Sequence, residues 1–286
     1  MSLLRDRMLR DMDRAGLSPR TQEKYIEAIV GLAKFHRKAP DQLTPDELRD
    51  WADDMARRGL SPSSQKIYLS AAKFLYRRTL FRPDMAAFLV GPRVTRRLPN
   101  VLSPSEVERV LAALYSPKYR MFFCLIYDTG LRVSEAAHLK AGDIDAGRGI
   151  IRIWQGKGSK DRQVKLGQRL LEMLRAYWRD VRLRQPHEEP LTRDSFLFTA
   201  RTGGHIGVPA ARAAINRAAR AAGIGKPVSP HALRHAFATA QLEAGTDLRV
   251  VQAQLGHTDI HSTQVYLHVS TRLIRQAPSP LDDLNL

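Results

Sequence analysis

The chain has 286 residues, with 46 Lys and Arg against 29 Asp and Glu, which gives a formal net charge of +17 at pH 7. This length favours two domains over one, and the basic excess favours nucleic acid or another polyanion as the partner. A single cysteine, Cys124, excludes a disulfide within the chain. No apolar run approaches the ~20 residues of a membrane span, and the charged N-terminus lacks the apolar segment of a signal peptide. The sequence therefore predicts a cytoplasmic protein.

The first 90 residues predict four helices separated by glycine and proline signals. Ser18-Pro19, Thr44-Pro45 and Ser61-Pro62 each place a capping residue before a proline, which is typical of a helix start. The four helices are expected at residues 3–14, 18–39, 44–58 and 61–75. Each has apolar side chains three and four residues apart, so a helical bundle with one buried face per helix is expected.

The fourth helix and the residues after it are strongly basic. Five cations and no acidic residue lie between positions 61 and 82: Lys66, Lys73, Arg77, Arg78 and Arg82. A solvated face of the bundle would account for this run, but so one-sided a charge favours a helix laid against DNA.

Residues 91–100, GPRVTRRLPN, predict a linker because two prolines and a glycine oppose a packed element. Arg96 and Arg97 in this linker are further candidates for DNA contact. Residues 1–100 carry 20 basic and 12 acidic side chains, and residues 101–286 carry 26 and 17. Since both parts are basic, both are expected to contact the polyanion, as a clamp around a duplex would require.

Residues 101–286 predict a mainly helical domain with a small antiparallel sheet. Alternating residues at 149–154 and 162–166 flank a turn rich in glycine and lysine, which predicts a hairpin. Residues 196–198 are a candidate third strand. Helices are expected from position 103 and at 119–127, 133–139, 170–183, 209–222 and from position 229.

The most informative stretch runs from position 229 to 269. His231, Arg234 and His235 form H-x-x-R-H on one helix, where residues three and four apart share a face. Gly256 and His257 follow an apolar helical run, and Tyr266 comes nine residues after His257. An arginine and two imidazoles on one face suit an anionic oxygen better than an apolar core.

Two upstream motifs complete a pattern that resembles the active-site region of tyrosine recombinases, the phage integrase family. G-L-R-V-S-E supplies Arg132, and G-K-G-S-K-D-R supplies Lys157 in the hairpin turn. The resemblance covers most of the chain and is closest to Xer-type and integron-type members. It implies a mainly α fold: an N-terminal four-helix core-binding (SAM-like) domain at 1–90, a linker at 91–100, and a mixed α catalytic domain with a small antiparallel sheet at 101–286.

The resemblance implies a site-specific recombinase that cuts and rejoins DNA through a 3′-phosphotyrosine. Four protomers on two DNA sites would exchange strands through a Holliday junction. Arg132 and Arg234 would bind the non-bridging phosphate oxygens, and Tyr266 would be the nucleophile. His231 would be the general acid/base, and His257 would donate a hydrogen bond to a phosphate oxygen. Lys157 would protonate the leaving 5′ oxygen, with Lys160 as the competing candidate.

Two neighbouring residues have expected supporting roles. Glu135 would orient Arg132 through a bidentate pair, and His235 would be structural. The paired histidines have a spacing that suits zinc, but Arg234 would repel a metal, so neither a metal nor a cofactor is expected.

Two other functions remain open at this stage: a non-catalytic DNA-binding regulator and a type IB topoisomerase-like enzyme. Among recombinases, Xer-like, integron-type and mobile-element roles are equally compatible with the sequence. Leucines at the end of the chain, after Pro280, are expected to bind a neighbouring protomer.

Overall fold

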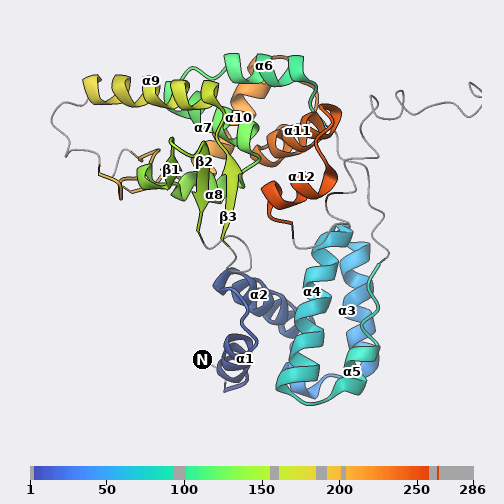
Figure 1. Ribbon diagram of the computed structural model, residues 1–286. Helices are drawn as coiled ribbons and strands as arrows, with labels where there is room; N and C mark the ends of the chain where they lie inside the picture. The colour runs from blue at the N-terminus through green and yellow to red at the C-terminus, as the bar shows by residue number, and fades with distance from the viewer. Residues whose placement is uncertain are drawn as a thin grey trace, which may run out of the picture. The chain divides into compact units, whose positions relative to one another are not determined.

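The computed structural model describes residues 3–92, 101–154, 161–184, 192–200, 204–257 and 263 (Figure 1). The chain divides into two compact units, residues 1–97 and 98–286. Within the described ranges, no helix is long and apolar enough to cross a membrane.

The first unit is helical throughout its described residues. Its elements are α1 (Leu3–Arg14), α2 (Pro19–His36), the 3₁₀ turn η1 (Pro40–Gln42), α3 (Pro45–Arg57), α4 (Pro62–Phe74), the π-helical turn η2 (Leu75–Thr79) and α5 (Pro83–Ala87). The predicted starts are confirmed at three helices. Ser18, Thr44 and Ser61 each accept a hydrogen bond from the backbone N–H three residues on, which satisfies a donor that the first helical turn leaves open.

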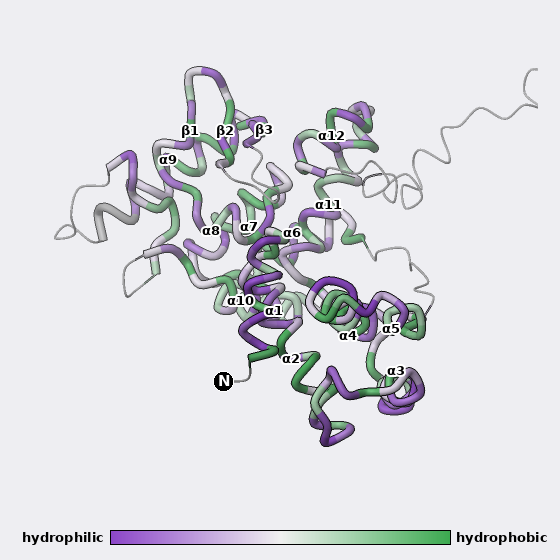
Figure 2. The backbone as a smooth tube through the Cα atoms, turned by 90° about the horizontal axis from the view of Figure 1, so that it is seen from below, coloured by the Kyte–Doolittle hydropathy of each residue, from purple (hydrophilic) through white to green (hydrophobic). Residues whose placement is uncertain are grey.

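The buried faces of these helices form a separate core. Helices α2 and α4 pack against each other, and green and purple stretches alternate along the helices in Figure 2, as expected for amphipathic helices. Trp51 and Tyr76 are buried in this core. The Tyr76 hydroxyl donates to the carbonyl of Pro40 at 2.6 Å, so the π-helical turn is fixed to η1.

The second unit combines helices with one small sheet. Its elements are α6 (Pro104–Ala112), α7 (Pro117–Thr129), α8 (Val133–His138), η3 (Ala141–Asp143), β1 (Ile144–Asp145), β2 (Ile150–Ile153), β3 (Arg162–Lys165), α9 (Gln168–Arg184), α10 (Val208–Ala221), α11 (Pro230–Glu243) and α12 (Leu248–Leu255). The strands are antiparallel in the order β1-β2-β3, and Ile153 pairs with Arg162.

The third strand of the sheet differs from the prediction. It is Ile144–Asp145, paired with β2, and not residues 196–198. Phe196 makes only an isolated bridge with Lys140. The Phe198 ring is buried and lies edge-on against the Phe122 ring, with 5.2 Å between the ring centroids. The apolar residues here therefore belong to the hydrophobic core and not to the β-sheet.

Helices α7 and α11 are the centre of the second core and position the site. Gly130 ends α7 in the left-handed region, with φ of 65°. A Cβ at this position would lie 2.4 Å from the Phe237 ring, so only glycine lets α11 approach so closely. This contact brings the H-x-x-R-H helix against the turn that precedes Arg132.

Candidate active site

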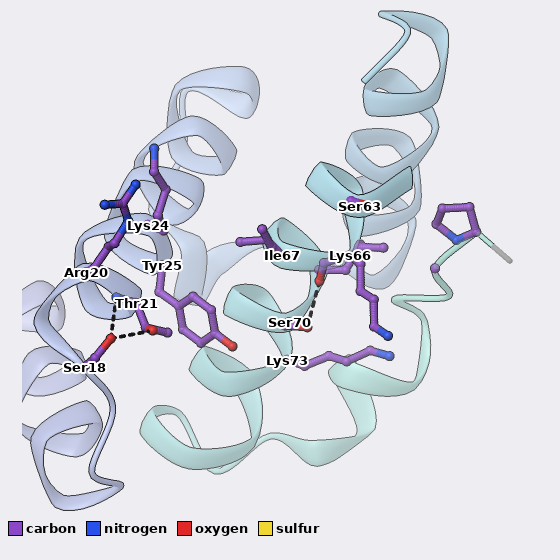
Figure 3. Close-up of a pocket in the computed structure, with 13 residues that line it drawn as sticks. Ser18, Arg20, Thr21, Lys24, Tyr25, Ser63, Lys66, Ile67, Ser70 and Lys73 are labelled. Atoms are coloured by element: carbon purple, nitrogen blue, oxygen red, sulfur yellow. Dashed lines mark hydrogen bonds between the residues drawn. The ribbon is translucent and has the colours of Figure 1, made fainter. Parts of the chain in front are cut away.

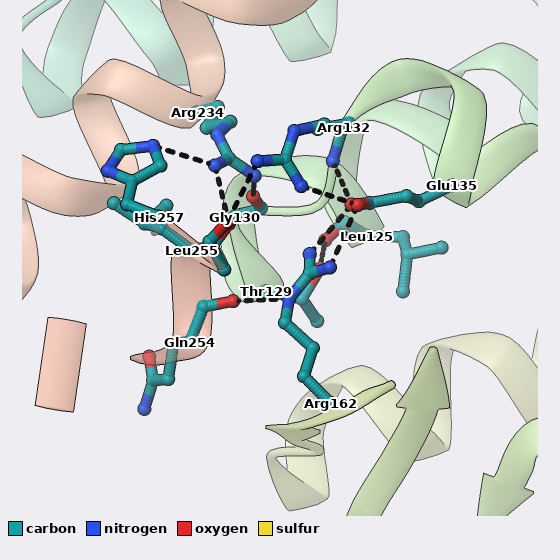
Figure 4. A network of polar contacts seen from close by, with 11 residues as sticks. Leu125, Thr129, Gly130, Arg132, Glu135, Arg162, Arg234, Gln254, Leu255 and His257 are labelled. Carbon is teal, nitrogen blue, oxygen red and sulfur yellow. Dashed lines mark hydrogen bonds and ion pairs between the residues drawn. The ribbon is translucent and has the colours of Figure 1, made fainter. Parts of the chain in front are cut away.

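Three arginines from distant parts of the second unit meet at the C-terminal end of α12 (Figure 4). Arg162 Nε donates to the Gln254 carbonyl at 2.9 Å, and Arg234 Nη2 donates to the Leu255 carbonyl at 2.6 Å. Arg132 Nη2 donates to the next carbonyl, that of Gly256, at 3.0 Å. The last carbonyls of a helix have no intrahelical partners and carry partial negative charge, which favours cations. One helix end therefore gathers three guanidinium groups.

Arg234 is the most deeply placed of these arginines, with 1% of the residue exposed. Its Nη1 donates to the Gly130 carbonyl at 2.6 Å, and its Nη2 lies 3.0 Å from His257 Nε2. Guanidinium remains charged at any ordinary pH. The fold thus holds a permanent cation between the end of α7 and the end of α12.

Glu135 links two of the arginines through both of its carboxylate oxygens. Its Oε1 accepts from Arg132 Nη1 at 2.7 Å and from Arg162 Nη1 at 2.8 Å. Its Oε2 accepts from the Arg132 backbone N–H and from Arg162 Nη2, both at 2.7 Å. Although burial opposes ionisation, the hydrogen bonds and charge of Arg162, together with the hydrogen bonds from Arg132, lower the pKa of Glu135 to about 2.

The pairing of Glu135 differs in one respect from the expectation. The expected bidentate partner was Arg132, but the two-oxygen pair is made with Arg162. The Arg132 side chain donates only one hydrogen bond to the carboxylate. The sequence predicts no role for Arg162, although this residue lies within the G-K-G-S-K-D-R motif. Its place at the start of a predicted strand is the signal that could have pointed to it.

The hydrogen bonds of His257 determine which ring nitrogen carries its proton. Arg234 can only donate, so His257 Nε2 accepts, and Nδ1–H donates to the Thr263 hydroxyl at 2.9 Å. In this arrangement Nε2 has no proton to donate to a phosphate, so the expected role of His257 requires both that Arg234 Nη2 moves away and that Nε2 gains a proton. Burial and the charges of Arg234 and Arg132 lower the pKa of His257 to about 4.

His231 and His235 lie on the same face of α11 as Arg234, with their ring centroids 4.3 Å apart. His231 is exposed, whereas His235 is half-buried. Burial of part of the ring and the charges of Arg234, Arg132 and Arg212 lower the pKa of His231. The deeper position of His235, beside His231 and Arg234, lowers its pKa to about 4. Of the two, His231 is the one that faces solvent.

The remaining predicted site residues lie outside the described residues. These are Lys157, Lys160, Tyr266, Arg96 and Arg97. Residues 155–160 connect β2 to β3, and Tyr266 follows the buried Thr263 by three residues.

A basic groove of about 1030 Å³ lies in the first unit between α2 and α4 (Figure 3). Its cations are Arg20 and Lys24 from α2 and Lys66 and Lys73 from α4. The hydroxyl groups of its lining are those of Ser18, Thr21, Tyr25, Ser63 and Ser70. Cations and hydroxyls in one groove suit a phosphate backbone. Lys66 and Lys73 are predicted from the sequence, whereas Arg20 and Lys24 are not; the packing of α2 against α4 brings all four to one groove.

Arg77 and Arg78 differ from Lys66 and Lys73 in their surroundings. Both are exposed on the π-helical turn, and neither lines the groove. Within the described ranges, no group of three or more His, Cys, Asp or Glu side chains is arranged to hold a metal ion.

The lowered pKa values of His235 and His257 predict a pH-dependent stability. The unfolded state, with a His pKa of about 6.5, binds more protons than the folded state between about pH 6.5 and pH 4. Stability is therefore full above pH 6.5 and falls as the pH falls toward 4. We expect the midpoint of thermal unfolding, followed by circular dichroism without DNA, to drop between pH 7 and pH 5. His235→Gln should reduce this slope, and an unchanged midpoint in the parent chain would contradict the prediction.

Family models match both units of the chain. Residues 100–272 match the phage integrase family, and residues 4–84 match the N-terminal SAM-like domain of phage integrases. A putative integrase/recombinase of Sinorhizobium fredii, y4qK, is 38% identical over 288 residues, which cover 99% of this chain and 89% of that protein. The tyrosine recombinase XerD of Ralstonia nicotianae is 41% identical over 204 residues, or 70% of this chain and 65% of XerD.

Solved structures share the fold across both units. The XerA recombinase is 29% identical and covers 95% of each chain, with a TM-score of 0.55. A lambda integrase dimer bound to a core site has a TM-score of 0.70 at 18% identity and covers 94% of this chain and 97% of that one, which is a likeness of fold. Together with the family matches, these likenesses confirm the mainly α fold, with its SAM-like N-terminal domain and small antiparallel sheet. The chain belongs to the phage integrase family, the tyrosine recombinases.

Proposed function

We propose that the chain is a site-specific DNA recombinase in which Tyr266 cuts one strand and Arg132 and Arg234 bind the phosphate that it attacks. One observation supports this most directly. Arg132, Arg234 and His257, separated by up to 125 positions in the chain, contact the same helix end. A structural ion pair would balance its charges, but here two guanidinium groups, those of Arg132 and Arg162, share the carboxylate of Glu135. Such an excess of positive charge suits an anionic substrate.

The proposed chemistry follows from the charge on the reacting phosphorus. Attack by the Tyr266 hydroxyl at phosphorus forms the phosphotyrosine bond and breaks the bond to the 5′ oxygen. The pentacoordinate transition state carries extra negative charge, which preorganised guanidinium groups stabilise. The Arg132 side chain is 24% exposed and open to the phosphate, whereas Arg234 lies deeper. The new ester keeps the bond energy for rejoining, so no nucleotide is consumed.

Two proton transfers accompany this step. The tyrosine hydroxyl must lose its proton, and the leaving 5′ oxygen must gain one. His231 is our candidate for the first because it is the exposed histidine of α11, and partial burial of the ring with the charges of Arg234 and Arg132 lowers its pKa, which favours the neutral form that accepts a proton. Lys157 is our candidate for the second, from the family motif, with Lys160 as the alternative. His257 is assigned to the phosphate once Arg234 Nη2 has moved away and His257 Nε2 has gained a proton to donate.

The groove in the first unit is the proposed DNA-binding surface of that unit. Lys66 and Lys73 carry the assignment because they line the groove with two further cations. Arg77, Arg78, Arg96 and Arg97 stay as proposed contacts that the groove does not include. We assign residues 1–90 and 101–286 to two domains joined by a linker. With this division, two basic surfaces on one chain would hold opposite sides of one duplex.

Lys66→Gln with Lys73→Gln should weaken binding to duplex DNA of any sequence. Each lost phosphate contact should lower the slope of log affinity against log salt by about 1. Fluorescence anisotropy over a salt series measures both affinity and slope. Lys34→Gln, at an exposed lysine of α2 outside the groove, is the control for the loss of one surface charge. A double variant with the slope of the control would remove the groove from the DNA interface.

The assembly and biological role are proposed from the relatives. By family resemblance, four protomers would act on two DNA sites. Structures that share this fold include a transposon integrase in complex with transposon end DNA. The proposed role is accordingly in a mobile element or in Xer-type recombination. The leucines after Pro280 are assigned to a neighbouring protomer.

Covalent capture on DNA tests the proposed function. A nicked duplex carrying the recombination site lets the short cleaved fragment diffuse away, which traps the protein on the DNA. A protein–DNA band on a denaturing gel supports the proposal, and EDTA should leave it unchanged. Binding without any band would indicate a non-catalytic regulator. Relaxation of supercoiled plasmid that lacks the site would indicate a topoisomerase.

A further inference from the structure

Arg162 is the one arginine of the cluster to which the proposed chemistry gives no role. It is the first residue of β3, paired with Ile153 of β2. Its side chain is only 10% exposed. The Nε and both Nη groups donate to Gln254 and Glu135, so the planar edges of the guanidinium are already occupied. These contacts join Arg162 to the carboxylate that bonds Arg132 and to the last turn of α12.

Its first neighbour is Glu135, whose charge Arg162 shares with Arg132. Each carboxylate oxygen accepts one bond from each arginine. If the Arg162 guanidinium were removed, Glu135 would be free to close a two-oxygen pair with Arg132, the geometry that a carboxylate prefers. Arg132 would then turn toward Glu135, and its charge would be neutralised. Arg162 therefore keeps part of the Arg132 guanidinium available.

Its second neighbour is the end of α12. Gly256 has φ of 62°, and a Cβ at this position would lie 2.9 Å from Arg162 Cδ and 3.0 Å from its Nε. The Arg162 side chain thus lies directly on the glycine whose carbonyl accepts from Arg132. Its bond to Gln254 fixes the same turn. One side chain therefore joins β3, α8 and the turn that leads to His257.

We infer that Arg162 is a positioning residue for DNA cleavage: with Glu135 and the last turn of α12, it fixes where Arg132 meets the scissile phosphate. The inference rests on the proposed function, because it assigns Arg132 to that phosphate. Arg162 itself makes no contact with DNA in this role. Its removal should slow the chemical step and leave DNA affinity nearly unchanged.

The test compares cleavage of two nicked substrates under single-turnover conditions. One carries the natural scissile phosphate, and the other carries a methylphosphonate, in which a methyl group replaces a charged oxygen. Arg162→Ala should slow cleavage of the natural substrate by roughly 10²-fold, the effect of a misplacement of about 1 Å. The methylphosphonate has no charge for a guanidinium to balance. The loss should therefore shrink on that substrate, as it should for Arg132→Ala.

The matched control is Arg152→Ala. Arg152 lies on the neighbouring strand β2 and pairs with Asp145 at 2.7 Å, away from Glu135. It should cleave both substrates like the parent chain. Arg162→Lys keeps the positive charge beside Glu135, so it should fold. Lysine cannot bond both Glu135 oxygens and the Gln254 carbonyl together, so this variant should still show the cleavage defect. Thermal unfolding confirms which variants are folded.

The outcomes separate this inference from the proposed function. If the parent chain forms no covalent complex, the proposed function fails. If the parent chain cleaves and both Arg162 variants cleave like Arg152→Ala, the positioning role is wrong. An equal loss on the natural and methylphosphonate substrates in folded Arg162→Lys would also overturn it, because a general loss of structure would not depend on the phosphate charge.

Discussion

Tyr266→Phe should abolish covalent attachment to DNA while leaving DNA affinity nearly unchanged. Phenylalanine removes only the hydroxyl oxygen, which is the atom that would bond to phosphorus, and no other tyrosine follows the L-G-H motif. A tyrosine with an ordinary pKa near ~10 needs nearby cations to react at neutral pH. The arginine cluster at the end of α12 supplies them. The measurement is the protein–DNA band from a nicked substrate on a denaturing gel, beside a binding curve.

Tyr127→Phe is the control for this variant. Tyr127 is partly buried on α7, and burial raises the pKa of its hydroxyl, which makes it a poorer nucleophile. This control should form the band at the parent rate. A band of undiminished strength from Tyr266→Phe would assign the nucleophile to another residue, and sequencing of the DNA-linked peptide would identify it.

Much of the first unit could be predicted because its signals are local. A serine or threonine followed by proline starts a helix through bonds within four residues. The start at Thr44, and the start at Ser103 in the second unit, carry the full reciprocal pair with a glutamate three residues on. The same local logic placed the hairpin strands within a residue or two. The fourth helix was harder, because its last turn widens into the π-helical η2, where Tyr76 is fixed by a distant carbonyl.

The arrangement of the site could be predicted only in part. Motif order singled out Arg132 and Arg234, which the structure brings to the same helix end. Their partners are the backbone carbonyls of Gly130, Leu255 and Gly256. Every residue has such a carbonyl, so the sequence does not show which one a side chain will bond. Arg162 was missed for the same reason, since its position depends on the register between β2 and β3. The proton on His257 Nδ1 likewise follows from a contact across 23 positions.

Arg132→Ala and Arg234→Ala should each slow cleavage by roughly 10²–10³-fold, the usual loss when one preorganised donor to a transition state is removed. Non-specific DNA affinity should change little, because each variant keeps the other 45 Lys and Arg residues. Single-turnover cleavage of the nicked substrate measures the first effect, and anisotropy measures the second. Cleavage within a few-fold of the parent rate would remove that arginine from the site.

The two variants should differ in stability, because the two side chains are buried to different extents. Arg234→Ala leaves the buried carbonyls of Gly130 and Leu255 without these donors, at a cost of about 1–3 kcal/mol for each unsatisfied group. The Arg132 side chain is 24% exposed, so after Arg132→Ala water can take over part of the hydrogen bonds that the guanidinium made. Thermal unfolding should therefore show a larger drop for Arg234→Ala. Arg234→Lys supplies the matched test: it keeps the charge but cannot donate to both carbonyls in the planar guanidinium geometry. If that variant were as stable and as active as the parent, charge alone would suffice, and the bonds to the two helix ends would not determine the site.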